Sequence, residues 1–262
     1  MLTINDKIIL KKSYMGEKNL TEVMMDPDVS IIEDWAFANC KALTKVWIPG
    51  SIERICDNAF FNCDKLVSIE LYDDIDKTPL YGGKYAYVLA LMVGQWTKDT
   101  QLFTDAVKDD SLFVKLSKRL PSFLEEADDS GFEPFLAGGE EDYDVKGAEE
   151  RYCHKRRLLK AKLIYEYLLS DEDKIEGSEL SKTCIRWLKD HNPSAAFGAI
   201  LDAAYHRKEY LKIYLDNAID EGADLNELIG MADADTEIKV ALLSSKSEKA
   251  EKQDSFFDSL LV

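Results

Sequence analysis

Histidine is scarce in this sequence: its 262 residues include only three, His154, His191 and His206. Neither a C-x-x-C nor an H-x-x-x-H pattern occurs, so the sequence offers no ligand set for a tetrahedral zinc site. The glycine motifs G-x-G-x-x-G and G-x-S-x-G, which mark dinucleotide binding and serine hydrolases, are also missing. We therefore predict no metal, no cofactor and no catalytic residues.

Long hydrophobic runs are missing as well. The longest one, residues 85–96, contains Gly94 and Gln95 and falls short of the roughly 18 apolar residues that a membrane-spanning helix needs. Residues 1–6 lack the basic and apolar regions of a secretory signal. The sequence therefore predicts a cytoplasmic protein without a transmembrane segment.

No part of the chain has an excess of basic residues. Lysine and arginine number 33 against 50 aspartates and glutamates, which gives 33 − 50 = −17. Residues 1–78 carry 9 basic and 14 acidic side chains (−5), and the remainder carries 24 and 36 (−12). Both parts would repel phosphate groups. We therefore predict that the protein binds neither nucleic acid nor an anionic membrane surface.

Cysteine occurs five times, at widely separated positions: Cys40, Cys56, Cys63, Cys153 and Cys184. An odd number of cysteines in a chain without an export signal argues against a disulfide framework. Cys40 and Cys63 stand 23 residues apart in equivalent surroundings. We predict that both are reduced, buried thiols, because unlinked cysteine packs as a small hydrophobe.

The same offset of 23 residues governs the first 71 positions. It aligns small or apolar residues in six columns: Ile9, Ile32, Ile55; Ser13, Ala36, Ala59; Tyr14, Phe37, Phe60; Leu20, Leu43, Leu66; Val23, Val46, Ile69; and Met25, Ile48, Leu71. A period of 20–29 residues with an L-x-x-V/I-x-I/L segment is typical of leucine-rich solenoids. Each repeat is predicted to form a short strand, a turn such as Pro49-Gly50 and a compact return.

Two copies share a further pattern, an isoleucine, a small residue followed by Phe, a Cys and an apolar strand. They read Ile32…Ala36-Phe37…Cys40…Leu43…Val46…Ile48-Pro49 and Ile55…Ala59-Phe60…Cys63…Leu66…Ile69…Leu71. This pattern resembles the bacterial surface-antigen type of leucine-rich repeat. The copy that starts at Ile9 is degenerate, with Glu17 in place of the cysteine, which suits a terminal cap. The resemblance implies a leucine-rich-repeat domain over residues 1–77. Relatives of that type are often surface-exposed, whereas this sequence shows no export signal.

Alternation along each strand places a set of polar and large side chains on the outer face of the repeats. We predict that this face binds a protein partner through Glu22, Met24, Thr44, Lys45, Trp47, Ser68 and Glu70. Trp47 is the strongest candidate, because a tryptophan on the surface is a good interface anchor. Two interpretations of Trp47 stay open: it contacts a partner, or the C-terminal helices of the same chain cover it. Trp35 is predicted to serve packing.

Residues 78–262 carry a helical pattern. A helix that starts near Gly83, with apolar residues at Tyr85, Val88, Leu89 and Met92, is predicted to cover the last layer of the repeats. Further helices are predicted around residues 103–107 and 113–120, the latter ending before Pro121. Residues 125–150 contain eleven carboxylates and one lysine and are predicted to form an acidic loop. The charges of the basic run 151–162 are predicted to balance nearby carboxylates.

The C-terminal part shows a second repeat-like pattern. Asn192-Pro193 is predicted to start a helix, and a partner helix follows near residue 209 and ends before Gly222. The segment Ala203-Ala204…Glu209-Tyr210-Leu211-Lys212…Leu215, followed by Gly-Ala-Asp-Leu-Asn at 222–226, resembles a degenerate ankyrin repeat. The opening Thr-Pro-Leu-His is absent and the second helix is about two residues too long. The resemblance implies an all-α, ankyrin-like domain over residues 78–262.

The predicted fold class is therefore α+β, a short leucine-rich solenoid followed by ankyrin-like helices. The favoured function is a non-catalytic protein–protein interaction or scaffold protein. An alternative is an enzyme with a site built from Cys153 or Cys184 and a histidine, since such pairs meet in space rather than in sequence. A third hypothesis is a structural subunit of a larger assembly. The sequence identifies neither the partner nor the oligomeric state.

Overall fold

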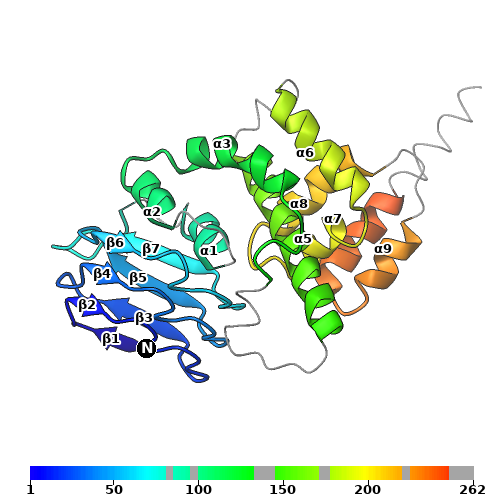
Figure 1. The fold of residues 1–262 in the computed structure, drawn as a ribbon. Coiled ribbons are helices and arrows are strands. Elements are labelled where there is room, and N and C mark those ends of the chain that lie inside the picture. The colour runs from blue at the N-terminus through cyan, green and yellow to red at the C-terminus, as the bar shows by residue number, and fades with distance from the viewer. Residues whose placement is uncertain (81–84, 95–99, 133–144, 171–177, 220–224, 248–262) are drawn as a thin grey trace, which may run out of the picture. The chain divides into compact units, whose positions relative to one another are not determined.

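The computed structural model describes residues 1–80, 85–94, 100–132, 145–170, 178–219 and 225–247. The chain divides into two compact units, Met1–Ser170 and Asp171–Val262. The first unit contains every strand and the helices α1 to α5, and the second contains the helices from α6 onward (Figure 1). The domain ranges 1–77 and 78–262 stay a prediction, because they mark where the repeats end rather than where the chain divides into compact bodies.

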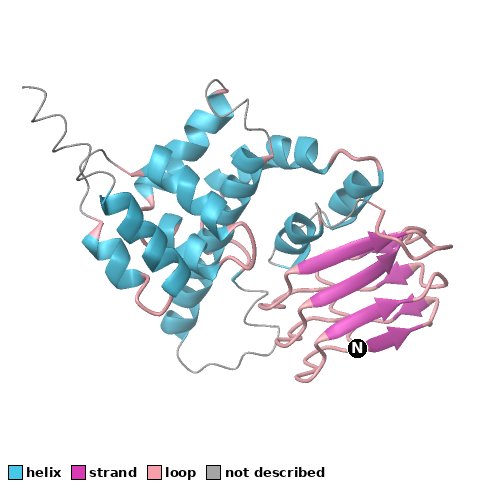
Figure 2. Ribbon diagram, turned by 180° about the vertical axis from the view of Figure 1, so that it is seen from behind, coloured by secondary structure: helices cyan, strands magenta, loops and turns pink. Residues whose placement is uncertain are grey.

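The repeats form a parallel β-solenoid of about three turns. One sheet has four strands in the order β1 (Leu2–Ile4), β3 (Glu22–Met25), β5 (Lys45–Pro49) and β7 (Ser68–Tyr72). The other has three, in the order β2 (Ile8–Ile9), β4 (Ile31–Ile32) and β6 (Arg54–Ile55). Each turn of the chain contributes one strand to each sheet, and the strands run parallel (Figure 2).

The strand register confirms the 23-residue alignment. Ile9 pairs with Ile32 and Ile32 with Ile55, while Val23 pairs with Val46 and Val46 with Ile69. Strand β1 departs from this spacing, because its Leu2 pairs with Val23 only 21 positions later. A search at a constant period therefore misses β1, which the structure adds as a fourth strand.

A stack of aromatic rings fills the space inside the turns. The rings of Tyr14 and Phe37 lie 5.2 Å apart at an interplanar angle of 4°, and those of Phe37 and Phe60 lie 5.3 Å apart at 5°. The Cys40 thiol donates a hydrogen bond to the Tyr14 carbonyl (3.0 Å), and the Cys63 thiol donates one to the Phe37 carbonyl (3.1 Å). Both cysteines are buried and unlinked, as predicted.

A second column of the repeat has left-handed backbone. Gly16, Asn39 and Asn62, each 23 residues apart, have φ values of 75°, 61° and 58°. Glycine and asparagine adopt this conformation more readily than other residues. The Asn62 amide also donates to the Asn39 side-chain oxygen at 2.6 Å, which links successive turns. These positions carry a conformational requirement that the apolar columns do not show.

Helices α1 (Ala86–Gly94) and α2 (Thr100–Lys108) cover the last turn of the solenoid. Helix α1 packs against β7 and α2 against β6 (Figure 1). Val88, Leu89 and Met92 are fully buried, and the Lys108 ammonium donates to the Ile52 carbonyl at 2.6 Å. The prediction that a helix starting near Gly83 covers the last apolar layer is thus confirmed. An end layer left in water would otherwise expose the apolar side chains of the last turn.

Helix α3 (Leu112–Glu125) continues through Pro121, so the prediction that it ends before the proline was wrong. A proline inside a helix removes one backbone hydrogen bond. Here the next turn holds Phe123 and Leu124, which are buried, and the helix packs along α5 (Val145–Leu169). Burial of these two side chains outweighs the missing bond.

Charged side chains join the end of α3 to α5. Glu126 accepts hydrogen bonds from Arg119 (2.6 Å) and Arg156 (2.5 Å). Asp128 accepts from Arg157 (2.6 Å) and Lys160 (2.8 Å). The prediction that the basic run balances nearby carboxylates is therefore confirmed. Of the stretch predicted as an acidic loop, residues 145–150 are helical and residues 133–144 lie outside the described part of the chain.

The first half of α5 also packs on the side of the solenoid. Tyr152 is fully buried against Ala38 and Phe61, with Trp35 and Phe132 packed around them. The Trp35 and Phe61 rings lie 5.1 Å apart, which agrees with a packing role for Trp35. The first unit is thus a solenoid covered at one end by α1 and α2 and on one side by α5.

The second unit is helical throughout its described residues. It contains α6 (Glu179–Asp190), α7 (Ala196–Asp202), α8 (Arg207–Ile213), the π-helix η2 (Tyr214–Ala218), α9 (Asn226–Met231) and a helix over residues 236–247. Helix α7 packs against α8, and α6 packs against η2. The segment that the sequence shows as about two residues too long coincides with η2, where wider turns take up extra residues.

Asn192 does not cap α7, so that prediction was wrong. The Asn192–Pro193 peptide is cis, and the helix begins at Ala196. The Asn192 side-chain oxygen instead accepts a hydrogen bond from the Tyr214 hydroxyl. A tertiary partner therefore occupies the oxygen that a helix cap would use. The predicted helix end at Gly222 lies outside the described residues.

Candidate interaction face of the solenoid

Strand pairing brings most of the predicted binding residues together on one face of the four-stranded sheet. Glu22 pairs with Lys45 and Lys45 with Ser68, while Met24 pairs with Trp47 and Trp47 with Glu70. These side chains alternate with the buried column Val23, Val46 and Ile69 and therefore point to the opposite face of the sheet. We call the residues Glu22, Met24, Lys45, Trp47 and Glu70 the strand face.

All five residues of the strand face are half-buried. Ser68 is buried, with 6% of its surface exposed. Thr44 lies just before β5, and its hydroxyl donates to the Thr21 carbonyl of the preceding turn at 2.9 Å. These two hydroxyl residues take part in the internal bonding of the scaffold, so the surface open to a partner is the strand face itself.

Trp47 is held in place by a charge pair. The Lys45 ammonium lies 4.4 Å from the Trp47 ring centroid and 2.6 Å from the Glu70 carboxylate. A cation over an indole ring is attracted by the electron-rich face of the ring. Lysine 45 therefore fixes one face of the ring while its own charge is balanced by Glu70. The ring is neither fully exposed nor fully covered.

Strand β1 extends this face by one more residue. Thr3 pairs with Met24 and so continues the row that runs through Trp47 to Glu70. The sequence pattern missed Thr3 because β1 is spaced by 21 residues rather than 23. The alternation of Thr3 between Leu2 and the buried Ile4 is the signal that could have identified it.

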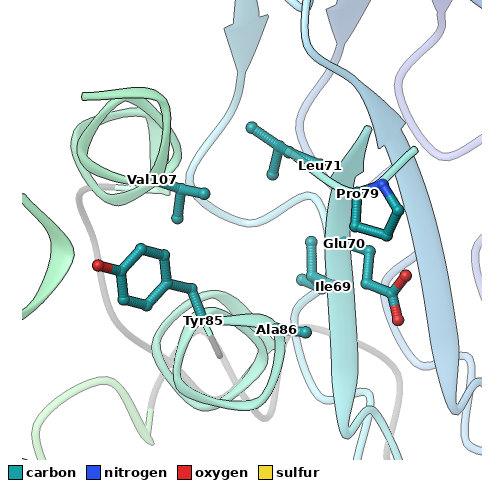
Figure 3. Close-up of a pocket in the computed structure, with 7 residues that line it drawn as sticks. All are labelled: Ile69, Glu70, Leu71, Pro79, Tyr85, Ala86 and Val107. Carbon is teal, nitrogen blue, oxygen red and sulfur yellow. The ribbon is translucent and has the colours of Figure 1, made fainter. Parts of the chain in front are cut away.

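A small pocket lies at the end of the sheet next to Glu70. It is bounded by Ile69, Glu70, Leu71, Pro79, Tyr85, Ala86 and Val107. Figure 3 shows the Tyr85 and Val107 side chains directed from the helices toward β7. Its lining is mainly apolar, and its carboxylate already pairs with Lys45. This arrangement favours packing between β7, α1 and α2 rather than chemistry.

The thiols offer little nucleophilic character. Burial raises the pKa of Cys184 to about 12, and burial is also the main cause of the raised pKa of Cys153. Desolvation raises the pKa of Cys63 well above its ordinary value. A hydrogen bond from Cys63 lowers the pKa of Cys40, but Cys40 is fully buried. Thiols with raised pKa values stay protonated at neutral pH and react slowly.

The histidines and carboxylates of the described residues do not form a chemical site. The His191 ring stacks on Trp187 with 3.9 Å between centroids, and its Nδ1 lies 2.8 Å from the Trp187 carbonyl. Within the residues that the structure describes, no group of three or more His, Cys, Asp or Glu side chains could hold a metal ion. The same residues include no helix long and apolar enough to cross a membrane.

The comparison with protein families agrees with this architecture. Residues 7–82 match the family described as "BspA type Leucine rich repeat region (6 copies)". The matched range covers the solenoid and ends before α1, so this region is a leucine-rich-repeat solenoid. No curated protein and no solved structure matches the chain significantly.

Proposed function

We propose that this protein is a non-catalytic interaction or scaffold protein whose strand face binds a protein partner. Leucine-rich-repeat regions generally mediate contacts between proteins, and residues 7–82 match such a family. The observation that carries the proposal is the half-buried Trp47, held on a regular sheet by Lys45 and Glu70. A large aromatic ring in a fixed position is the kind of residue that dominates the binding energy of an interface.

The mechanism is presentation of a rigid surface. The strand face is backed by the ring stack of Tyr14, Phe37 and Phe60, and α1 covers the last strand. Residues that are ordered before binding lose little conformational freedom on binding. The partner is expected to be a protein, because the net charge of −17 disfavours nucleic acid and anionic membranes. The cytoplasmic location remains a prediction from the sequence.

The second unit is proposed to be an ankyrin-like helical stack. Helices α7 and α8 pack against each other and are joined by residues 203–206. Arg207 and Lys208 form ion pairs with Asp235 and Glu237, which connect α8 to the helix at residues 236–247. Contacts from one helix pair to the next are what a stacked repeat requires.

The test is quantitative affinity capture with the full chain as bait. Trp47→Ala should reduce recovery of the specific partner strongly, since truncating a central tryptophan typically costs about 2 kcal/mol or more, roughly 30-fold in affinity. Tyr205→Ala removes a similarly large aromatic side chain, 48% exposed, from the second unit and serves as the matched control. Equal recovery with Trp47→Ala and the wild type, at unchanged thermal stability, would reject the strand face as the binding surface.

A further inference from the structure

The solenoid has one covered end and one open end. Helices α1 and α2 pack on β7 and β6, whereas β1 and β2 lie at the opposite end (Figure 1). Within the described residues, β1 pairs only with β3, and β2 pairs only with β4. The outer edges of β1 and β2 therefore present backbone N–H and C=O groups that a further extended chain could bind. We call the first turn, residues 1–20, the N-terminal edge.

Apolar side chains are exposed at this edge. Ile8 and Leu10 have 40% and 60% of their surface exposed. Tyr14 is the first ring of the aromatic stack, so Phe37 covers only one of its faces. Ile8, Leu10 and Tyr14 line a shallow pocket together with Ser13 and the Asp6-Lys7 pair. The pocket is open toward the side where a further turn of a solenoid would lie.

The N-terminal edge also differs from the rest of the protein in charge. Residues 1–20 contain four lysines and two acidic residues, or 4 − 2 = +2, while the remaining chain carries 29 basic and 48 acidic side chains, or −19. The four lysines are exposed, and none forms an ion pair with a described residue: Lys7, Lys11, Lys12 and Lys18. A cluster of unpaired cations beside open strand edges favours an anionic occupant.

We propose that the N-terminal edge binds an extended acidic peptide segment of a partner protein. Its backbone would add to the edge of β1 or β2, as in other cases of strand addition. Its apolar side chains would contact Ile8, Leu10 and the open face of Tyr14, and its carboxylates would pair with the lysines. This site is separate from the strand face, so it goes beyond the proposed function and does not depend on it.

Charge distinguishes this occupant from two others. A second copy docked edge to edge would bring two clusters of four lysines together, which like-charge repulsion disfavours. A long nucleic acid would extend beyond the edge and meet a chain with a charge of −19 over its remaining residues. A peptide of a few residues matches the short edge strands, of three residues in β1 and two in β2.

The probe for this proposal is a fluorescein-labelled peptide with the sequence Gly-Glu-Val-Glu-Ile-Glu-Val-Glu-Gly, and fluorescence anisotropy measures its binding to the full chain. Binding should be measurable at low salt and weaken as salt increases, because the lysines and carboxylates are screened. The same peptide with lysine in place of glutamate should not bind. A second, unbranched control with glycine in place of Val and Ile tests the apolar contribution and should bind more weakly.

Charge-reversal variants locate the site. Lys7→Glu/Lys18→Glu should weaken peptide binding by about tenfold, a rough estimate for two exposed ion pairs and the added repulsion. Lys65→Glu/Lys118→Glu reverses two exposed lysines elsewhere in the first unit and gives the same net charge, −17 − 4 = −21. This control should leave the dissociation constant within about twofold of the wild type. Leu10→Ser should also weaken binding, and Val114→Ser, 53% exposed on α3, should not.

Several outcomes would overturn the proposal. These are no binding by the wild type at low salt, equal loss in both charge-reversal variants, or equal affinity for the glutamate and lysine peptides. Tighter binding of a 20-nucleotide oligothymidylate than of the peptide would also overturn it. A concentration-dependent dimer that Leu10→Ser dissociates would show that a second copy occupies the edge instead. Thermal unfolding of each variant establishes that the change in binding does not reflect unfolding.

Discussion

The solenoid and the α3–α5 pair lie in the same compact unit but are stabilised differently. Inside the solenoid, the same apolar or aromatic residue recurs every 23 positions and stacks on its copy in the next turn. At the junction of α3 and α5, single, non-repeated charges meet: Glu126 and Asp128 with Arg156, Arg157 and Lys160. Every buried charged side chain among the described residues lies on α5.

This difference separates two kinds of stability. A stacked layer gains from burying apolar surface, and the gain does not depend on pH or salt. A buried charge is stable only while its partners are in place, because removing it from water is costly. Lys160 has 3% of its side chain exposed and donates to Asp128 and to the Glu126 carbonyl at 2.6 Å. The ammonium thereby also binds carbonyl groups at the end of α3, where a cation is favoured.

The largest expected effect comes from the centre of the ring stack. Phe37→Ala removes the ring between Tyr14 and Phe60 and should lower the free energy of unfolding of the first unit by about 3–5 kcal/mol. Chemical denaturation followed by tryptophan fluorescence measures this change. Ile75→Ala, at a side chain that is 94% exposed, serves as the control and should change stability by less than about 0.5 kcal/mol. Equal effects of both substitutions would show that the stack is not the core of the solenoid.

A smaller effect is expected at the charged junction. Lys160→Met should destabilise the α3–α5 pair by about 2–4 kcal/mol, since it leaves Asp128 and the α3 carbonyls without this buried partner. Lys155→Met is the matched control: its ion pair with Asp64 is 40% exposed at the lysine and is worth less than about 1 kcal/mol. Hydrogen exchange of residues 112–125 measures the local stability. Similar protection in both variants would contradict the role assigned to Lys160.

The smallest effect concerns acid pH. Burial raises the pKa of Asp128, but hydrogen bonds from Lys160 and Arg157 lower it more, so the folded pKa lies below the unfolded value. Its contribution is therefore complete above the unfolded pKa of about 3.9 and is lost as pH falls through the folded value. Hydrogen exchange of α3 and α5 should accelerate in this range before that of the sheet. Asp128→Asn should reduce this difference, and a sheet that opens first would contradict the comparison.

The sequence predicted the solenoid well because repetition makes its physics visible. A buried column must carry a similar side chain in every turn, so Phe37 and Phe60 or Cys40 and Cys63 can be recognised without coordinates. The outward strand positions follow from the same alternation, and six of the seven predicted binding residues lie on β3, β5 and β7. Strand β1 escaped this reasoning because its spacing is two residues shorter.

The helices were less predictable because their boundaries depend on partners distant in sequence. Pro121 is a local signal for a helix end, but burial of Phe123 and Leu124 extends α3 beyond it. Asn192 is a good capping residue by type, but the Tyr214 hydroxyl occupies its side-chain oxygen. In both cases a tertiary contact outweighs a local preference that is worth only a few kcal/mol at most.

The sequence by itself determined the period, the inward columns, the small net acidity of the repeats and the need to cover their last layer. Only the tertiary structure decided that Lys45 and Glu70 hold Trp47, that Lys160 joins α3 to α5, and that β1 and β2 leave an open, lysine-rich edge. A repeat expresses its packing in residue spacing, because each turn meets a copy of itself. Contacts between unlike segments have no spacing to reveal them, so their pairing is set by the folded geometry.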